Sequence, residues 1–217
     1  MAENRLLKAE RTAEEKKVED KMEFICSDID SYVFPENHFD IVLFNASLHH
    51  FNKVERLLSE HVINCLNNKG LLVINEYVGL NSLQFKKNQI KAINKALESV
   101  PDKYRTRFRS RLKKRRFSGY GVLRMIISDP SECIDSENII PSIHKYYNTI
   151  LERPFGGNLL MHVLMDISHH FVELNDDKKD VLNTLFDLED DYLKQNASDF
   201  VFGVYEKSMS ANNKATS

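Results

Sequence analysis

Three apolar runs in the first half of the chain end in polar residues, the types that could bind or transform a small molecule. They are residues 24–28, ending in Asp28, residues 39–45, ending in Asn45, and residues 71–77, ending in Glu76 and Tyr77. Short apolar runs bounded by turn residues are typical of buried parallel strands. Open α/β sheets bind their ligands at the carboxyl ends of such strands. We therefore expect Asp28 and Asn45 to line a ligand site.

Two adjacent histidines, His49 and His50, follow Asn45 closely. A histidine at this place could act as a general base on a substrate hydroxyl, because its pKa lies near neutrality. The alternative is a ring that packs at the start of the next helix. Asp28 and Asn45 have similar alternatives, as a turn residue and as a strand-end cap. We predict that His49 and His50 are the catalytic candidates.

Strands and helices alternate along the chain. The strand–helix–strand order over residues 39–77 predicts a parallel sheet with right-handed crossovers. Further strands are expected at residues 147–151 and 200–205, and helices at 3–17, 158–174 and 177–195. Residues 82–117 interrupt this alternation with a polar, largely helical pattern. We interpret residues 80–128 as a helical lid over the substrate side of the sheet.

Composition limits the class of protein. The 217 residues, 42% of them hydrophobic, suffice for one sizeable core. We expect one domain over residues 1–207 and a disordered tail at 208–217. The net charge of −2 gives no general attraction to nucleic acid, and the three cysteines lack the spacing of metal ligands, so no metal site is expected. No apolar stretch reaches the roughly 20 residues that span a membrane, and we expect a cytoplasmic protein.

Nine Lys and Arg residues lie between Lys103 and Arg116. Tyr104 and Phe108 lie among them and could stack on bases, which would suit nucleic acid. The alternatives are a solvated helix face or a lid that meets an anionic substrate. Because charged runs are usually solvated, we expect no nucleic-acid partner. We expect instead a small-molecule substrate with an anionic part.

Several stretches resemble the C-terminal two-thirds of the class I S-adenosylmethionine-dependent methyltransferases. FDIVLFNASLHHF, residues 39–51, is similar to the fourth-strand motif of that family, and CLNNKGLLVINEYVG, residues 65–79, to its fifth-strand motif. ICSDID, residues 25–30, resembles the third strand with its acidic end. The resemblance covers residues 3–207. It implies a Rossmann-like α/β sheet with the strand order 3-2-1-4-5-7-6 and a helical insertion after the strand that ends in Glu76 and Tyr77.

The sequence departs from the family at its first motif, a glycine-rich turn where the backbone approaches the cofactor. The first glycine here is Gly70, and the acidic residue that ends the family's second strand is also missing. The resemblance therefore implies a sheet that lacks its first two strands, as in an N-terminally truncated member. The strand at residues 24–28 would then have no neighbour. The strand at 39–45 would be an exposed edge, which a partner chain or a second copy could cover.

The resemblance also assigns roles to the candidate residues. Asp28 and Ile29 match positions that contact the adenine ring of S-adenosylmethionine, and Asn45 matches a residue that closes over its methionine part. Glu76 and Tyr77 would face the substrate, with structural packing as the alternative for Tyr77. We predict an S-adenosylmethionine-dependent methyltransferase, or a remnant of one, for a small-molecule or sugar-containing acceptor. The alternative is a non-catalytic methyltransferase-like fragment or interaction module, and we expect this chain alone to bind the cofactor weakly or not at all.

Overall fold

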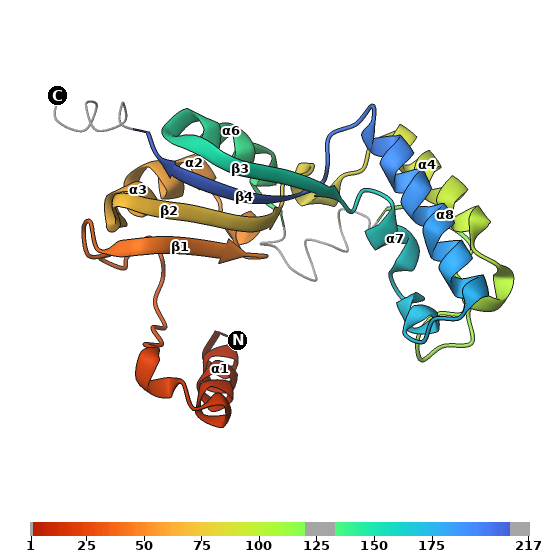
Figure 1. Ribbon diagram of the computed structural model, residues 1–217, viewed down its shortest axis with the longest axis horizontal. Coiled ribbons are helices and arrows are strands. Elements are labelled where there is room, and N and C mark those ends of the chain that lie inside the picture. The colour runs from red at the N-terminus through yellow and green to blue at the C-terminus, as the bar shows by residue number, and fades with distance from the viewer. Residues whose placement is uncertain (1, 120–132, 209–217) are drawn as a thin grey trace. The chain divides into compact units, whose positions relative to one another are not determined.

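The computed structural model describes residues 2–119 and 133–208, and the chain divides into two compact units, Met1–Pro35 and Glu36–Ser217. The smaller unit holds the helix α1, Ala2–Lys16, which confirms the helix expected there, and a 3₁₀ turn, η1, Glu19–Lys21 (Figure 1). The strand expected at residues 24–28 was wrong, because this segment forms no ladder with any described strand. Without such a ladder the backbone N–H and C=O groups of this segment need water as their hydrogen-bond partner. The 47% exposure of Ile25 agrees with a solvent-accessible segment.

The larger unit is built on a four-stranded sheet in the order β1-β2-β4-β3 (Figure 1). The strands are β1, Phe39–Asn45, β2, Leu66–Tyr77, β3, Tyr147–Gly156, and β4, Phe200–Lys207. β1 and β2 are parallel, and β4 runs antiparallel to both of its neighbours. This is the 4-5-7-6 end of the strand order that the resemblance implies. The expected Rossmann-like α/β fold is confirmed.

Helical segments cover one face of this sheet. Between β1 and β2 lies one continuous helical stretch, made of α2, Val54–Arg56, the π-helical η3, Leu57–Val62, and α3, Ile63–Cys65. A 3₁₀ turn, η6, Ser136–Asn138, leads into α6, Ile139–Tyr146, before β3. The core between these helices and the sheet is fully buried and includes Leu58, Leu72, Ile74, Ile143 and Tyr205.

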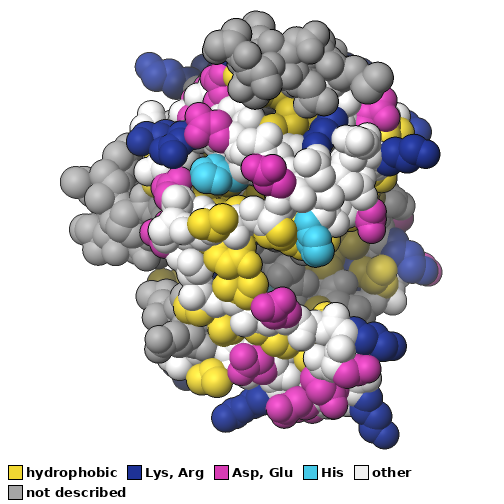
Figure 2. All heavy atoms as spheres, turned by 90° about the vertical axis from the view of Figure 1, so that its left-hand side faces the viewer, with side chains coloured by type: hydrophobic (Ala, Val, Ile, Leu, Met, Phe, Trp, Pro, Cys, Tyr) yellow, Lys and Arg dark blue, Asp and Glu magenta, His cyan; other side chains and the backbone are white. Residues whose placement is uncertain are grey.

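Apolar side chains on the edge strand β1 are exposed. Ile41 and Leu43 are 58% and 61% exposed, although both belong to the central part of the strand. Their register partners on β2 are Leu71 and Val73, so these four side chains share one face of the sheet. β1 pairs with β2 alone among the described strands, as expected for an edge. In the view of Figure 2, hydrophobic side chains likewise gather between acidic and basic ones on the molecular surface.

A second hydrophobic core lies beyond one end of the sheet (Figure 1). It is formed by α4, Lys87–Ser99, α7, Leu160–Leu164, and α8, Asp176–Leu193. α8 confirms the helix expected at residues 177–195. The helix expected at 158–174 is instead split into α7 and a 3₁₀ turn, η7, Ser168–Phe171. Asp166 adopts a left-handed φ of 67° between them, which interrupts the helical path.

The segment after β2 is less helical than the sequence suggests. Its helical parts up to residue 119 are α4 and two 3₁₀ turns, η4, Asn81–Leu83, and η5, Asp102–Tyr104. Arg109 has a left-handed φ of 51°, and an isolated bridge joins Thr106 to Lys113, so the basic run folds back as a loop. Residues 120–128 of the expected lid, and residues 209–217 of the expected tail, lie outside the described residues. No described helix is both long and apolar enough to cross a bilayer.

Candidate active site

Glu76, near the carboxyl end of β2, holds the turn that follows β1. Its Oε1 atom accepts hydrogen bonds from the backbone N–H groups of Ser47, at 2.6 Å, and Leu48, at 2.8 Å. Its Oε2 atom lies 2.7 Å from Nδ1 of His49. Glu76 is 1% and His49 is 7% exposed. One buried carboxylate therefore fixes both the 3₁₀ turn η2, Leu48–His50, and the imidazole of His49.

The contact with Glu76 also selects the tautomer of the His49 ring. An ionised carboxylate only accepts hydrogen bonds, so Nδ1 of His49 carries the proton in this contact. In the neutral ring the lone pair then lies on Nε2, the nitrogen that can take a proton from a substrate. A base that a buried carboxylate holds in one orientation can act in general base catalysis. The structure thus brings together the predicted His49 and Glu76.

Asn45 and Asn75 lie side by side at the carboxyl ends of β1 and β2. They are register partners, and the side-chain amide of Asn75 donates to Oδ1 of Asn45 at 2.8 Å. The backbone N–H of Ala46 donates to the carbonyl of Asn75 at 2.9 Å, and Ala46 has a left-handed φ of 49°. The Asn45 carboxamide is exposed at this corner. It is available to a ligand, although it is also held in place as a strand-end residue.

His50 and Tyr77 pack against neighbouring rings. The His50 ring lies 4.3 Å from that of His49, measured between centroids, and is half-buried. Tyr77 is buried, its hydroxyl donates to the carbonyl of Leu80 at 3.1 Å, and its ring packs on Phe200. These contacts match the packing alternative for Tyr77.

Asp28 and Ile29 belong to the smaller unit, in a turn rather than at a strand end. Oδ1 of Asp28 accepts the backbone N–H of Asp30 at 2.9 Å, and its carbonyl accepts those of Ser31 and Tyr32. Asp28 is exposed and Ile29 is half-buried. This is the turn that the sequence offered as the alternative for Asp28, and the adenine contact stays a prediction.

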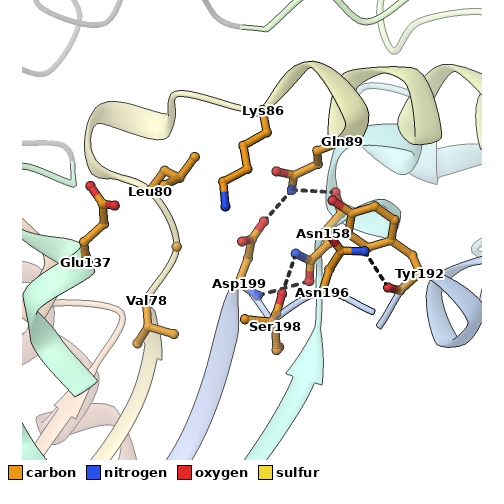
Figure 3. A pocket seen from close by; sticks show the side chains of 12 residues that line it. Val78, Leu80, Lys86, Gln89, Glu137, Asn158, Tyr192, Asn196, Ser198 and Asp199 are labelled. Carbon is orange, nitrogen blue, oxygen red and sulfur yellow. Dashed lines mark hydrogen bonds between the residues drawn. The ribbon is translucent and has the colours of Figure 1, made fainter. Parts of the chain in front are cut away.

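The sequence did not point to a polar pocket of about 270 Å³ in the larger unit (Figure 3). It lies past the end of β2, where Val78 and Leu80, the start of α4 and the start of β4 meet. Asp199 and Gln89 are both buried in its wall and joined by a hydrogen bond of 2.7 Å. These residues are 110 positions apart in sequence, so only the fold reveals them as a pair.

Most basic side chains of the 103–116 run already have acidic or carbonyl partners. Lys103 pairs with Asp177 at 2.5 Å, Arg107 with Asp166 at 2.6 Å, and Lys113 with Asp102. Nζ of Lys114 is buried and donates to the carbonyls of His162 and Met165. Among the described residues, no group of histidine, cysteine and acidic side chains could hold a metal ion.

Residues 2–74 match the family model described as a methyltransferase domain. This match agrees with the class that the motifs suggest. The matched stretch is 73 of the 217 residues, and within it the sequence is similar to methyltransferase domains. No curated protein matches the chain.

Solved structures with a similar fold include the [4+2]-cyclase SpnF, at 15% sequence identity and a TM-score of 0.46, with 92% of this chain and 61% of that chain covered. The PH0226 protein from Pyrococcus horikoshii OT3 is 13% identical, with a TM-score of 0.45 and 95% and 68% covered. The phosphoethanolamine N-methyltransferase 2 of Haemonchus contortus, in complex with S-adenosyl-L-methionine, is 12% identical, with a TM-score of 0.44 and 89% and 40% covered. The present chain thus spans about three-fifths of the length of the first of them.

Proposed function

We propose that the chain is an S-adenosylmethionine-dependent methyltransferase that acts on a small-molecule acceptor. The observation that carries this proposal is the His49–Glu76 pair, held at 2.7 Å where the parallel strands β1 and β2 end. Ligands of open α/β sheets bind at this edge. The match of residues 2–74 to the methyltransferase domain supports the same reading.

S-adenosylmethionine, when bound, presents a methyl group on a sulfonium, and the acceptor's lone pair displaces the sulfur in line. Positioning supplies much of the acceleration of such a displacement. The residues of this chain contribute a base for the proton that the acceptor must lose. Nε2 of His49 takes that proton, and Glu76 keeps the ring oriented and stabilises the resulting imidazolium.

The residues present fit one part of the cofactor. The exposed carboxamide of Asn45 stands at the carboxyl end of β1, and Asn75 holds its oxygen, so its N–H groups can donate to the methionine carboxylate. Asp28 and Ile29 are proposed for the adenine on the resemblance alone. No glycine precedes Gly70, so this chain offers no glycine-rich turn for close backbone approach.

The test is the formation of S-adenosylhomocysteine from S-adenosylmethionine in the presence of a small-molecule extract. We expect turnover that depends on the extract, and a loss of about a hundredfold or more in His49→Gln, the lower end of the range for general base catalysis. His38→Gln replaces an exposed histidine before β1 and should retain full turnover. Turnover that is absent at saturating cofactor, or equal in the two variants, would contradict the proposal.

A second candidate is a non-catalytic methyltransferase-like module. It is favoured by the missing glycine-rich turn and by the exposed apolar side chains of the edge strand β1, which suit a covering chain. The same assay separates the two, because a module would give no S-adenosylhomocysteine with any extract. A module should also change its oligomeric state with concentration, which sedimentation analysis would detect.

A further inference from the structure

We propose that the pocket past the end of β2 is a binding site for a small zwitterion. Asp199 would receive its amino group and Lys86 its anionic group. This site does not depend on the proposed function. One buried carboxylate and one exposed amine line this pocket together (Figure 3).

Asp199 is held firmly with one oxygen left for a ligand. Asp199 is 9% exposed. Its backbone N–H donates to Oδ1 of Asn158 at 3.0 Å, and its backbone carbonyl accepts the N–H of Val78 at 2.8 Å. Oδ2 accepts from the side-chain amide of Gln89. Oδ1 accepts no hydrogen bond from any described residue. A carboxylate oxygen that faces the pocket can accept a hydrogen bond from a ligand N–H.

The electrostatics of Asp199 agree with a cationic partner. Burial raises the pKa of this carboxyl, and Glu189 nearby acts in the same direction. The hydrogen bond from Gln89 and the charge of Lys86 oppose that rise. An ammonium group against Oδ1 would stabilise the ionised form, because an opposite charge favours it.

Gly79 allows the strand end to approach this carboxylate. A Cβ atom there would lie 2.7 Å from Oδ1 of Asp199 and 2.6 Å from the Tyr77 hydroxyl. Both distances are too short for any other residue without a shift. The absence of a side chain at Gly79 therefore leaves room for Oδ1 of Asp199.

Lys86 supplies the opposite charge on the wall of the same pocket. Its exposed side chain extends from the start of α4 toward Asp199 (Figure 3). Unlike Lys103 or Lys113, it forms no ion pair with any described acidic residue. With one water taking about 30 Å³ of liquid, a pocket of about 270 Å³ admits a small metabolite. A molecule with charges at both ends would meet both residues.

The test is a titration of the ¹⁵N-labelled full chain with glycine, β-alanine and γ-aminobutyrate, observed by NMR without cofactor. Propylamine and propionate serve as probes that carry only one of the two charges. We expect one of the zwitterions to shift the Gln89 side-chain amide and the backbone amides of Gly79 and Asp199. It should do so at least tenfold more tightly than either single-charge probe.

Matched variants locate the two contacts. Asp199→Asn keeps an oxygen for Gln89 but loses the charge, and Lys86→Gln changes an exposed side chain, so both should fold. Each should weaken the zwitterion at least tenfold, whereas the exposed controls Asp187→Asn and Lys87→Gln should not. The inference is overturned if no zwitterion shifts these amides, or if Asp199→Asn binds as the unchanged chain does. Binding without any S-adenosylhomocysteine formation would keep the site and reject the methyltransferase.

Discussion

Two buried glutamates organise the backbone at the ends of strands. Glu76 binds the N–H groups of η2 together with the His49 ring, as described above. Glu189 of α8 accepts the backbone N–H groups of Asn158, Leu159 and Leu160 at 2.8–2.9 Å, at the start of α7. An ionised carboxylate has acceptor sites only, so each needs donors around it. Both turns thus depend on a side chain far away in sequence.

Glu76→Gln should destabilise the larger unit by about 1–3 kcal/mol. The substitution replaces one of the two carboxylate oxygens, which accept hydrogen bonds, with an NH₂ group, which donates them. Urea unfolding measures the change in free energy. Glu206→Gln on β4, at an exposed position, is the control and should change little. Equal losses in the two variants would show that Glu76 does not hold η2.

His162 should make stability depend on pH. Burial, and then the charge of Lys114, lowers its pKa from 6.5 to about 4. The unfolded chain therefore binds more protons than the folded chain between these values, and the free energy of unfolding rises with pH across this window. Acidification from pH 6.5 to 4 should remove about 3 kcal/mol.

Urea unfolding at a series of pH values tests this expectation. His162→Phe, with a ring of similar shape beside Phe85 and Phe117, should flatten the dependence. His38→Gln at an exposed position should leave it intact. A slope that survives in His162→Phe must come from another group.

Strands were predictable where a ladder partner exists within the chain. The apolar runs that became β1, β2, β3 and β4 all have such partners, so periodicity and length identified them. Residues 24–28 have a similar composition but no partner, and no strand forms. The single helix expected at 158–174 does not form. Where α7 ends, Nζ of Lys114, a residue distant in sequence, donates to the carbonyls of His162 and Met165. No local pattern encodes that contact.

Limited proteolysis should first cleave the basic loop. Arg109 and Arg111 are exposed, and Arg109 lies at a left-handed φ outside any helix or strand. Trypsin needs an extended, accessible segment, and local stability is lowest where few apolar contacts hold the backbone. We expect cuts after Arg109 or Arg111 before any after Lys53, Arg56 or Lys69. Equally fast cleavage between residues 39 and 77 would mean that the sheet is not formed.

The sequence predicted individual residues of the candidate site but not how they pair. His49 could be singled out because it comes shortly after an apolar strand, and Glu76 because it lies near the end of another. Their pairing requires the register of β1 with β2, in which Asn45 lies opposite Asn75. The sequence did not predict the pairing of Asp199 with Gln89. The two residues are 110 positions apart, and only the fold brings their side chains together.

The chain by itself should bind S-adenosylmethionine more weakly than low-micromolar, a limit of about −8 kcal/mol. It has no glycine before Gly70, and Asp28 lies in an exposed turn. Isothermal titration calorimetry measures this affinity. A low-micromolar dissociation constant would show that the strand ends described here suffice without the glycine-rich turn.

A site at the ends of β1 and β2 can be located by following where S-adenosylmethionine touches this chain. The ¹⁵N-labelled protein is titrated with S-adenosylmethionine up to its highest soluble concentration, and the amide signals are followed. We expect shifts of the Asn45 and Asn75 side-chain amides and of the His49 backbone amide. The exposed amide of Asn183 on α8 should not move. Signals of Asn45 and His49 that stay in place throughout the titration would contradict a methyltransferase site at the ends of β1 and β2.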